Sequence, residues 1–127
     1  MIDVKILRET PELVKQSCTR RGVDTKIVDD AVALDAAHRE ILKSVESMRS
    51  ERNRLSAECK TNPEARVAVK QLKEKLAEAE NRLAESEKSV NHTMSRLPNL
   101  LSPEVPDGKS DADNREIRKS GNIKPFT

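Results

Sequence analysis

The fold of this 127-residue chain is decided by residues 45–76, which read VESMRSERNRLSAECKTNPEARVAVKQLKEKL. On both sides of TNP at 61–63, apolar residues recur at alternating steps of three and four positions, separated mainly by charged and polar residues. This pattern is typical of coiled-coil helices. Asn62 and Pro63 predict a break with an immediate restart, because Asn caps a helix N-terminus and Pro suits the first turn. So short a connection makes the two helices antiparallel neighbours.

The apolar pattern extends outward over an expected first arm at about residues 24–60 and a second arm at about 63–97. Each arm would be about 50 Å long at about 1.5 Å per residue. The seam of the first arm has the rows Ile27, Leu34, Ile41, Met48, Leu55 and Ala31, His38, Val45, Arg52, Cys59. The seam of the second arm has the rows Val69, Leu76, Leu83, Val90, Leu97 and Ala65, Leu72, Ala79, Ser86, Thr93. We therefore predict an all-α fold, a long antiparallel two-helix coiled-coil hairpin.

Two polar residues of the first seam need their own interpretation. A lone histidine such as His38 on a seam is more often a hydrogen-bonded filler than a ligand or a switch. Arg52 lies near the expected tip and is out of place for pure packing. It is therefore a candidate for binding a partner.

The composition fits one elongated domain with a narrow core, since 35% of the residues are hydrophobic, 36% are charged and Phe126 is the only aromatic residue. The sequence contains no apolar stretch near the roughly 20 residues of a membrane span and no signal-peptide block at its start. We therefore expect a cytoplasmic protein. Cys18 and Cys59 are too few and too distant for a disulfide framework or a zinc site, so we interpret them as small apolar fillers.

The segments that flank the hairpin have different characters. Residues 1–7 fit either a strand-like lead or a first helical turn. Thr10 and Pro11 then predict the start of a short helix that ends at Gly22 and packs at the base of the hairpin. After Leu97, three prolines and a polar run predict an irregular linker over residues 98–127. We expect residues 1–97 to form the helical-hairpin domain, the linker to lead into an absent domain, and the chain to be a fragment.

Charge is unevenly distributed along the hairpin. Residues 24–48 hold three basic and six acidic residues, whereas residues 49–75 around the tip hold eight basic and four acidic residues. The basic residues of the tip are Arg49, Arg52, Arg54, Lys60, Arg66, Lys70, Lys73 and Lys75. A basic end on a thin rod suits a phosphate backbone, and the lack of Tyr and Trp favours recognition by shape and charge over base stacking. A solvated surface on a structural or adaptor coiled coil is the alternative, and charge alone does not decide between the two.

No catalytic or metal-binding constellation is visible in the sequence. It has no Gly-rich phosphate loop, no nucleophile elbow and no cluster of His and carboxylates at metal-ligand spacing. We therefore assign no catalytic residue, metal site or cofactor to this chain.

Several segments taken in order resemble a known family. They are MIDVKILRETPELV at 1–14, RRGVD at 20–24, RSERNRLS at 49–56, LPNL at 97–100 and PEVPDGK at 103–109. Together they resemble the N-terminal domain of bacterial-type seryl-tRNA synthetases over nearly the whole chain. The most specific piece, LPNL followed by PEVPDGK, is similar to that family's junction between the arm and the catalytic domain.

The resemblance implies a parent serine–tRNA ligase that joins serine to its tRNA using ATP and Mg²⁺. It also implies a class II catalytic domain that forms a homodimer, and an arm that reaches the long variable arm and elbow of the tRNA. The eight basic residues of the tip are the tRNA-binding residues that it implies, with those of the second arm less firmly placed. The isolated chain would be a monomer. A free-standing relative of the arm with another role is a further alternative.

Overall fold

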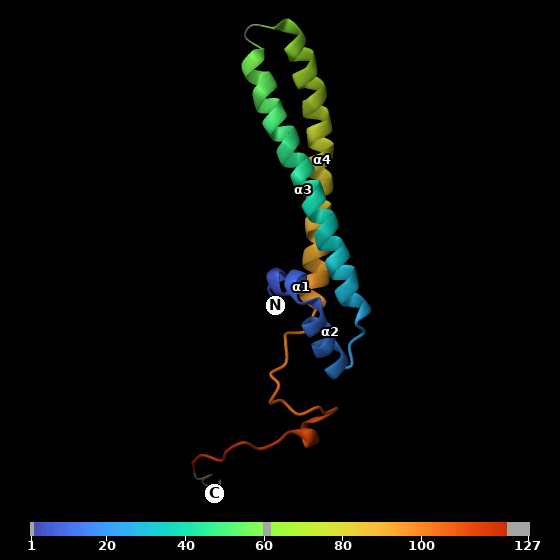
Figure 1. The fold of residues 1–127 in the computed structure, drawn as a ribbon, viewed down its shortest axis with the longest axis vertical. Helices are drawn as coiled ribbons and strands as arrows, with labels where there is room; N and C mark the ends of the chain where they lie inside the picture. The colour runs from blue at the N-terminus through green and yellow to red at the C-terminus, as the bar shows by residue number, and fades with distance from the viewer. Residues whose placement is uncertain (1, 60–61, 122–127) are drawn as a thin grey trace, which may run out of the picture.

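The structure, a computed structural model, describes residues 2–59 and 62–121. Two long helices lie side by side along its whole upper part, and two short helices lie near the lower end (Figure 1). The elements are α1 (Val4–Glu9), α2 (Pro11–Arg20), α3 (Lys26–Glu58), α4 (Pro63–Arg96) and a 3-10 turn, η1 (Asp111–Asp113). The described ranges contain no strand. The all-α class and the antiparallel hairpin are confirmed.

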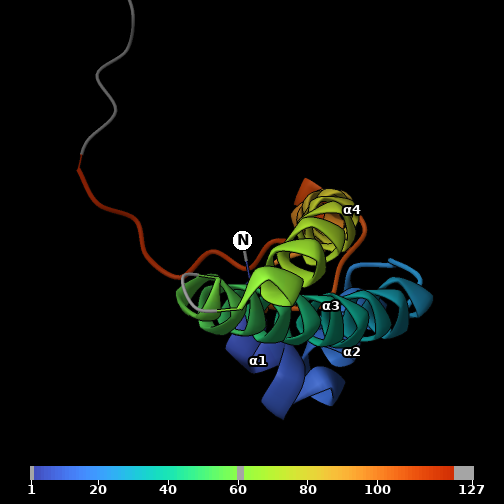
Figure 2. The ribbon, with the colours of Figure 1, turned by 90° about the horizontal axis from the view of Figure 1, so that it is seen from above.

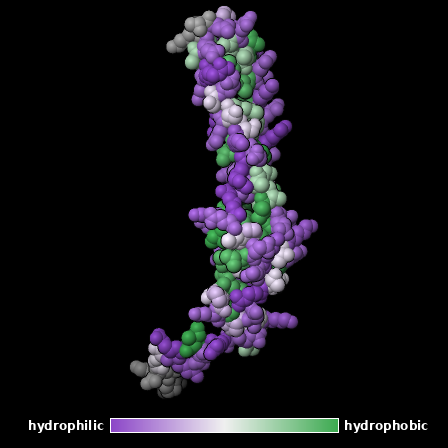
Figure 3. Space-filling model, in the orientation of Figure 1, coloured by the Kyte–Doolittle hydropathy of each residue, from purple (hydrophilic) through white to green (hydrophobic). Residues whose placement is uncertain are grey.

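The seam between α3 and α4 holds the residues that the heptads assign to it. Each of these positions is buried or half-buried, including His38 and Arg52. Val45 is fully buried and Leu76 is 4% exposed, whereas most charged residues of the two helices are exposed. Small residues such as Ala65 let the two helices approach closely. The face of the rod drawn in Figure 3 is mainly hydrophilic, with apolar areas between the charged side chains.

The ends of the helices follow local signals in the sequence. The Asn62 side chain accepts a hydrogen bond from the amide of Glu64 at 3.0 Å, which caps α4 directly before Pro63. After α2, Gly22 has φ +66°. The amide of Val23 donates to the carbonyl of Cys18 at 2.9 Å, and the amide of Gly22 donates to that of Thr19 at 3.0 Å. This is the Schellman arrangement that glycine permits after a helix.

The base of the hairpin is the thickest part of the molecule. The expected short helix is α2, and α1 precedes it, so the start of the chain is helical and not strand-like. Figure 2 shows α1 and α2 on one side of α3 and α4 on the other. The buried cluster that joins them consists of Ile2, Leu7, Val14, Cys18, Val28, Ala31, Met94 and Leu97. Burial raises the pKa of the Cys18 thiol, in keeping with a packing role.

One partly buried ion pair ties α1 to α3. Both carboxylate oxygens of Asp35 accept hydrogen bonds at 2.7 Å from the Arg8 guanidinium. Arg39 also donates to Asp35, at 3.1 Å, one turn further along α3. Asp35 is only 3% exposed, so these two arginines satisfy a charge that would otherwise be unpaired inside the base.

Residues 98–121 form an irregular segment beyond α4, in the region where the sequence predicts no continuing helix. Leu97 is still buried in the base cluster, and Leu101 is half-buried. From residue 102 onward every described residue is exposed. The segment turns at residues 102–105 and again at η1, and then extends away from the hairpin (Figure 1).

Candidate nucleic-acid interface

The basic residues of the tip belong to both arms. Arg49, Arg52 and Arg54 lie near the end of α3, and Arg66, Lys70, Lys73 and Lys75 lie near the start of α4. Lys60, the eighth predicted residue, lies outside the described residues. The α3–α4 pairing thus brings two separate stretches of sequence to the same end of the rod (Figure 1). The contacts of these side chains divide them into two groups.

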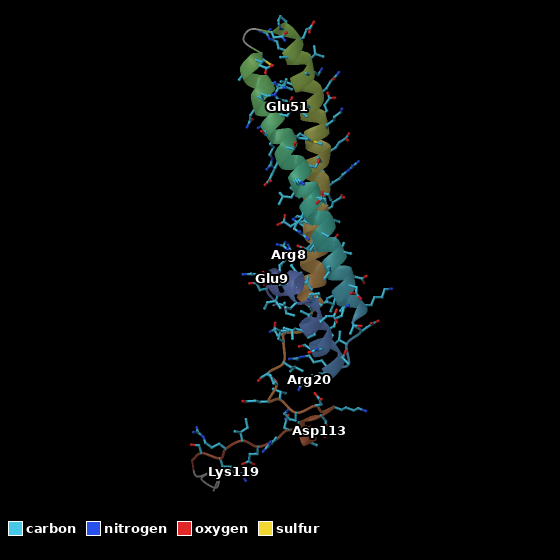
Figure 4. All side chains as sticks on the ribbon, viewed as in Figure 1. Arg8, Glu9, Arg20, Glu51, Asp113 and Lys119 are labelled. Carbon is cyan, nitrogen blue, oxygen red and sulfur yellow. The ribbon has the colours of Figure 1, made fainter. Side chains whose placement is uncertain are left out.

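Arg49 and Arg54 are already paired with carboxylates. Arg49 reaches across to α4, where its Nη2 lies 2.7 Å from a carboxylate oxygen of Glu80. Arg54 lies between Glu51 at 2.6 Å and Glu58 at 2.7 Å (Figure 4 labels Glu51). The pairing raises the pKa of Arg54 and lowers the pKa of Glu51. These two arginines therefore contribute less net positive potential than the sequence suggests.

The second group has no acidic partner within the part of the chain that the structure describes. It consists of Arg52, Arg66, Lys70, Lys73 and Lys75. The four members on α4 are exposed, and Arg52 is half-buried at the seam. The Arg52 guanidinium donates to the side-chain oxygen of Asn53 at 3.0 Å. No carboxylate among the described residues compensates its charge, which therefore remains available to an anion.

Helical periodicity sorts the α4 residues by side. Spacings of four and three residues keep Arg66, Lys70 and Lys73 within about 60° of one another around the helix axis. We call these three residues the basic stripe. Lys75 follows Arg66 by about two and a half turns, which places it on the opposite flank of α4. A single surface cannot contact both flanks of the helix.

Arg52 is turned toward the same side as the basic stripe. Its partner Asn53 follows Arg49 by one turn of α3, and Arg49 contacts Glu80. Glu80 in turn lies about two turns after Lys73 on the same flank of α4. We therefore define the distal basic face as Arg52, Arg66, Lys70 and Lys73. Heptad counting could have separated Lys75 from this face, whereas the Arg49–Glu80 contact depends on the register of the two arms.

The remaining polar seam residue is explained by packing. A ring nitrogen of His38, Nδ1, lies 2.8 Å from the Ser86 hydroxyl, and that hydroxyl also bonds the carbonyl of Leu83 at 2.8 Å. His38 is thus a hydrogen-bonded filler, as predicted. Across residues 2–59 and 62–121, no group of His, Cys, Asp and Glu is arranged to hold a metal ion. In the same residues, no helix is long and apolar enough to cross a membrane.

The sequence profile described as "Seryl-tRNA synthetase N-terminal domain" matches residues 1–101. The chain belongs to this family. Curated members similar to it are the serine–tRNA ligases of Staphylococcus saprophyticus, 33% identical over 133 residues, and of Dictyoglomus turgidum, 41% identical over 133 residues. Both alignments cover 99% of this chain and 31% of the relative.

Solved structures of the seryl-tRNA synthetase family have the same fold. The seryl-tRNA synthetase of Pyrococcus horikoshii, complexed with ATP, matches with a TM-score of 0.78 at 33% identity, over 89% of this chain and 27% of that one. The cytoplasmic serine–tRNA ligase of Naegleria fowleri, in complex with AMP, matches with a TM-score of 0.77 at 22% identity, over 98% and 29%. The present chain therefore spans about a third of the length of the family members it matches.

Proposed function

We propose that the chain is the tRNA-binding arm of a serine–tRNA ligase. In this proposal the distal basic face holds the sugar–phosphate backbone of serine tRNA at its long variable arm and elbow. The observation that carries the proposal is the grouping of Arg52, Arg66, Lys70 and Lys73 on one side of the tip. These four residues lack acidic partners within the described ranges, on an arm of the seryl-tRNA synthetase family.

The chemistry of the face favours recognition by backbone and shape. Guanidinium and ammonium groups attract phosphates irrespective of base identity. Phe126, far from the tip in sequence, is the only aromatic residue of the chain, so stacking on bases does not contribute there. Of the other predicted residues, Arg49 and Arg54 would have to exchange a carboxylate for a phosphate, and Lys75 would contact RNA only if the tRNA wrapped around α4. Lys60 remains part of the proposal.

The proposal extends to the parent enzyme. We propose that residues 1–97 form the arm domain and that residues 98–127 link it to a class II catalytic domain, which attaches serine to tRNA using ATP and Mg²⁺. The parent would be a cytoplasmic homodimer, and the isolated arm a monomer. ATP and Mg²⁺ would bind outside this chain, whose described residues offer no metal-ligand cluster.

The adaptor alternative gains no support from the seam. A protein partner would need apolar residues of the hairpin, and the heptad positions of α3 and α4 already cover one another. The free-standing alternative is tested by the gene itself. A class II synthetase sequence after Thr127 supports the ligase, and a stop codon supports a separate binding module.

The decisive experiment measures tRNA binding by the 127-residue chain. We expect a serine tRNA with a long variable arm to bind more tightly than a tRNA with a short variable arm. The affinity should fall steeply as salt is raised, because binding releases counterions. Equal affinity for the two tRNAs at physiological salt would refute the specificity.

A charge-matched pair of variants locates the site. One variant carries Arg52→Gln, Arg66→Gln, Lys70→Gln and Lys73→Gln. The control removes four exposed basic residues of the hairpin that lie outside the tip, namely Lys26, Lys43, Arg82 and Lys88, in the same way. Both variants have the same net charge, so only a localised site predicts that the first loses far more affinity than the second. Equal losses would show that general attraction to RNA explains the binding.

A further inference from the structure

The segment that follows α4 is attached to the helical body through α2. Its apolar contribution to the base ends at Leu97 and Leu101, and residues 102–121 are exposed. Burial therefore does not determine the path of the chain after residue 101. Polar contacts from two side chains of α2, Ser17 and Arg20, do so instead.

Arg20 contacts the segment at three points. Its Nε donates to a carboxylate oxygen of Asp107 at 2.6 Å, and its Nη1 donates to the carbonyl of Ser102 at 3.4 Å. Its Nη2 donates to the carbonyl of Val105. Ser17, which is 5% exposed, accepts a further bond from the amide of Leu101 at 3.2 Å. We call these contacts the α2 clamp. Figure 4 shows Arg20 at the end of α2 nearest the C-terminal segment.

The clamp holds a segment that is itself folded. The amide of Val105 donates to the carbonyl of Ser102 at 3.1 Å. Just beyond the clamp, Asp113 accepts from the amides of Lys109 at 2.8 Å and Ser110 at 3.2 Å. A Cβ at Gly108 would lie 2.5 Å from the Cβ of Asp113, so only glycine allows this close turn. The clamp therefore fixes a short structured connector and not a loose tether.

A small change in the angle of the hairpin at its base produces a large displacement of its tip. The hairpin is about 50 Å long, so a rotation of about 10° at its base moves the tip by about 9 Å. A displacement of that size would separate the distal basic face from a phosphate it is meant to contact, because direct contacts require separations of about 3 Å.

We propose that Arg20, assisted by Ser17, is a positioning residue that sets the angle between the arm and the polypeptide that follows it. The inference rests on the proposed function, in which a catalytic domain follows and the arm guides tRNA toward it. Arginine suits the task because its planar group carries five N–H donors in a fixed arrangement. A lysine keeps the positive charge, but its single ammonium group cannot donate to three separate acceptors in a fixed planar arrangement.

The test uses the full-length ligase that contains this chain, with Arg20→Ala, Arg20→Lys and Arg21→Ala. Arg21 is the matched control, because it is the neighbouring residue, is exposed, and forms no ion pair with any described residue. For Arg20→Ala we expect the KM for serine tRNA to rise by about ten- to a hundredfold. Serine-dependent pyrophosphate exchange, which needs no tRNA, should be unchanged. Arg20→Lys should behave like Arg20→Ala, and Arg21→Ala like the wild type.

Hydrogen exchange in the same enzymes reports on the clamp directly. Exchange at residues 101–107 should accelerate in Arg20→Ala and Arg20→Lys but not in Arg21→Ala. Two results would overturn the inference: equal effects of Arg20→Ala and Arg21→Ala on KM, which indicate a general loss of charge, or faster exchange with an unchanged KM. Failure of the wild-type enzyme to charge tRNA with serine would refute the proposed function itself, and it would be seen before any substitution is made.

Discussion

Arg8 and Asp35 join helix α1 to the long helix α3 through paired charges, with two hydrogen bonds of 2.7 Å across 27 residues of sequence. The Arg8 guanidinium lowers the pKa of Asp35, with a smaller contribution from Arg39 and against the opposing effect of burial. The ion pair therefore links the docking of α1 to the protonation of one carboxyl group.

Stability should depend on pH through Asp35. In the unfolded chain Asp35 takes up a proton near its ordinary pKa of 3.8, whereas in the folded chain it does so only at lower pH. The stabilisation is therefore fully present above about pH 4 and is lost as the pH falls toward the folded pKa. We expect the thermal midpoint to drop as the pH is lowered from about 6 to about 3, and to drop less in Asp35→Asn. Glu51 and Asp113, whose pKa values are also lowered, should leave a residual slope. An identical slope in wild type and variant would contradict the prediction.

Two leucines of the base should differ sharply in their effect on stability. Leu7 of α1 is fully buried, whereas Leu13 of α2 is 48% exposed. Leu7→Ala should lower the free energy of unfolding by about 2–5 kcal/mol, because it removes buried methyl groups and leaves a cavity. Leu13→Ala should change it by less than about 1 kcal/mol. Denaturant titrations followed by circular dichroism measure both, and equal losses would show that the base is packed differently.

Lys70 and Lys75 test the side of α4 that contacts RNA. The two residues are of one type, five positions apart and both exposed, but only Lys70 lies on the basic stripe. Lys70→Ala should weaken binding of serine tRNA and reduce the slope of log affinity against log salt by about 0.7–0.9. Lys75→Ala should leave that slope nearly unchanged. Titrations at several salt concentrations give both slopes, and a larger change for Lys75 would place the RNA on the other flank.

Arg52 and Arg54 test the role of acidic partners. Arg52 has only a neutral partner, Asn53, whereas Arg54 is held by Glu51 and Glu58. Arg52→Ala should reduce the affinity for serine tRNA several-fold, because a phosphate contact is lost. Arg54→Ala should reduce it less, because the Arg54 guanidinium is engaged with carboxylates and makes no phosphate contact in this proposal, so that only the general attraction of one positive charge is lost. Circular dichroism should show full helix content for Arg52→Ala; a larger loss of affinity for Arg54→Ala would reverse the assignment.

The elements that could be predicted from the sequence are those encoded by neighbouring residues. The heptads determine the seam, Asn62 and Pro63 determine the turn, and Gly22 ends the short helix. The Arg8–Asp35 ion pair joins two segments that are separate in the sequence, and no local sequence pattern indicates that they lie close together. The Arg49–Glu80 contact and the orientation of Arg52 require the register of the two arms, which is a tertiary property.

The pairing of Arg54 could be predicted from the sequence, because Glu51 and Glu58 lie at helical spacings from it. The contacts of Arg20 had no local signal, since its partners lie more than 80 residues away.

Helices α1 and α2 cover only the lower part of α3, so the rod has three layers at its base and two beyond (Figures 1 and 2). Each helix near the tip packs against a single neighbour, through a seam that includes Arg52 and small residues such as Ala65. Bending stiffness therefore falls from the base toward the tip. We therefore expect bending to concentrate near the tip, whereas the three-layered base holds the direction of the arm. A bend close to the tip moves the distal basic face far less than an equal rotation at the base does.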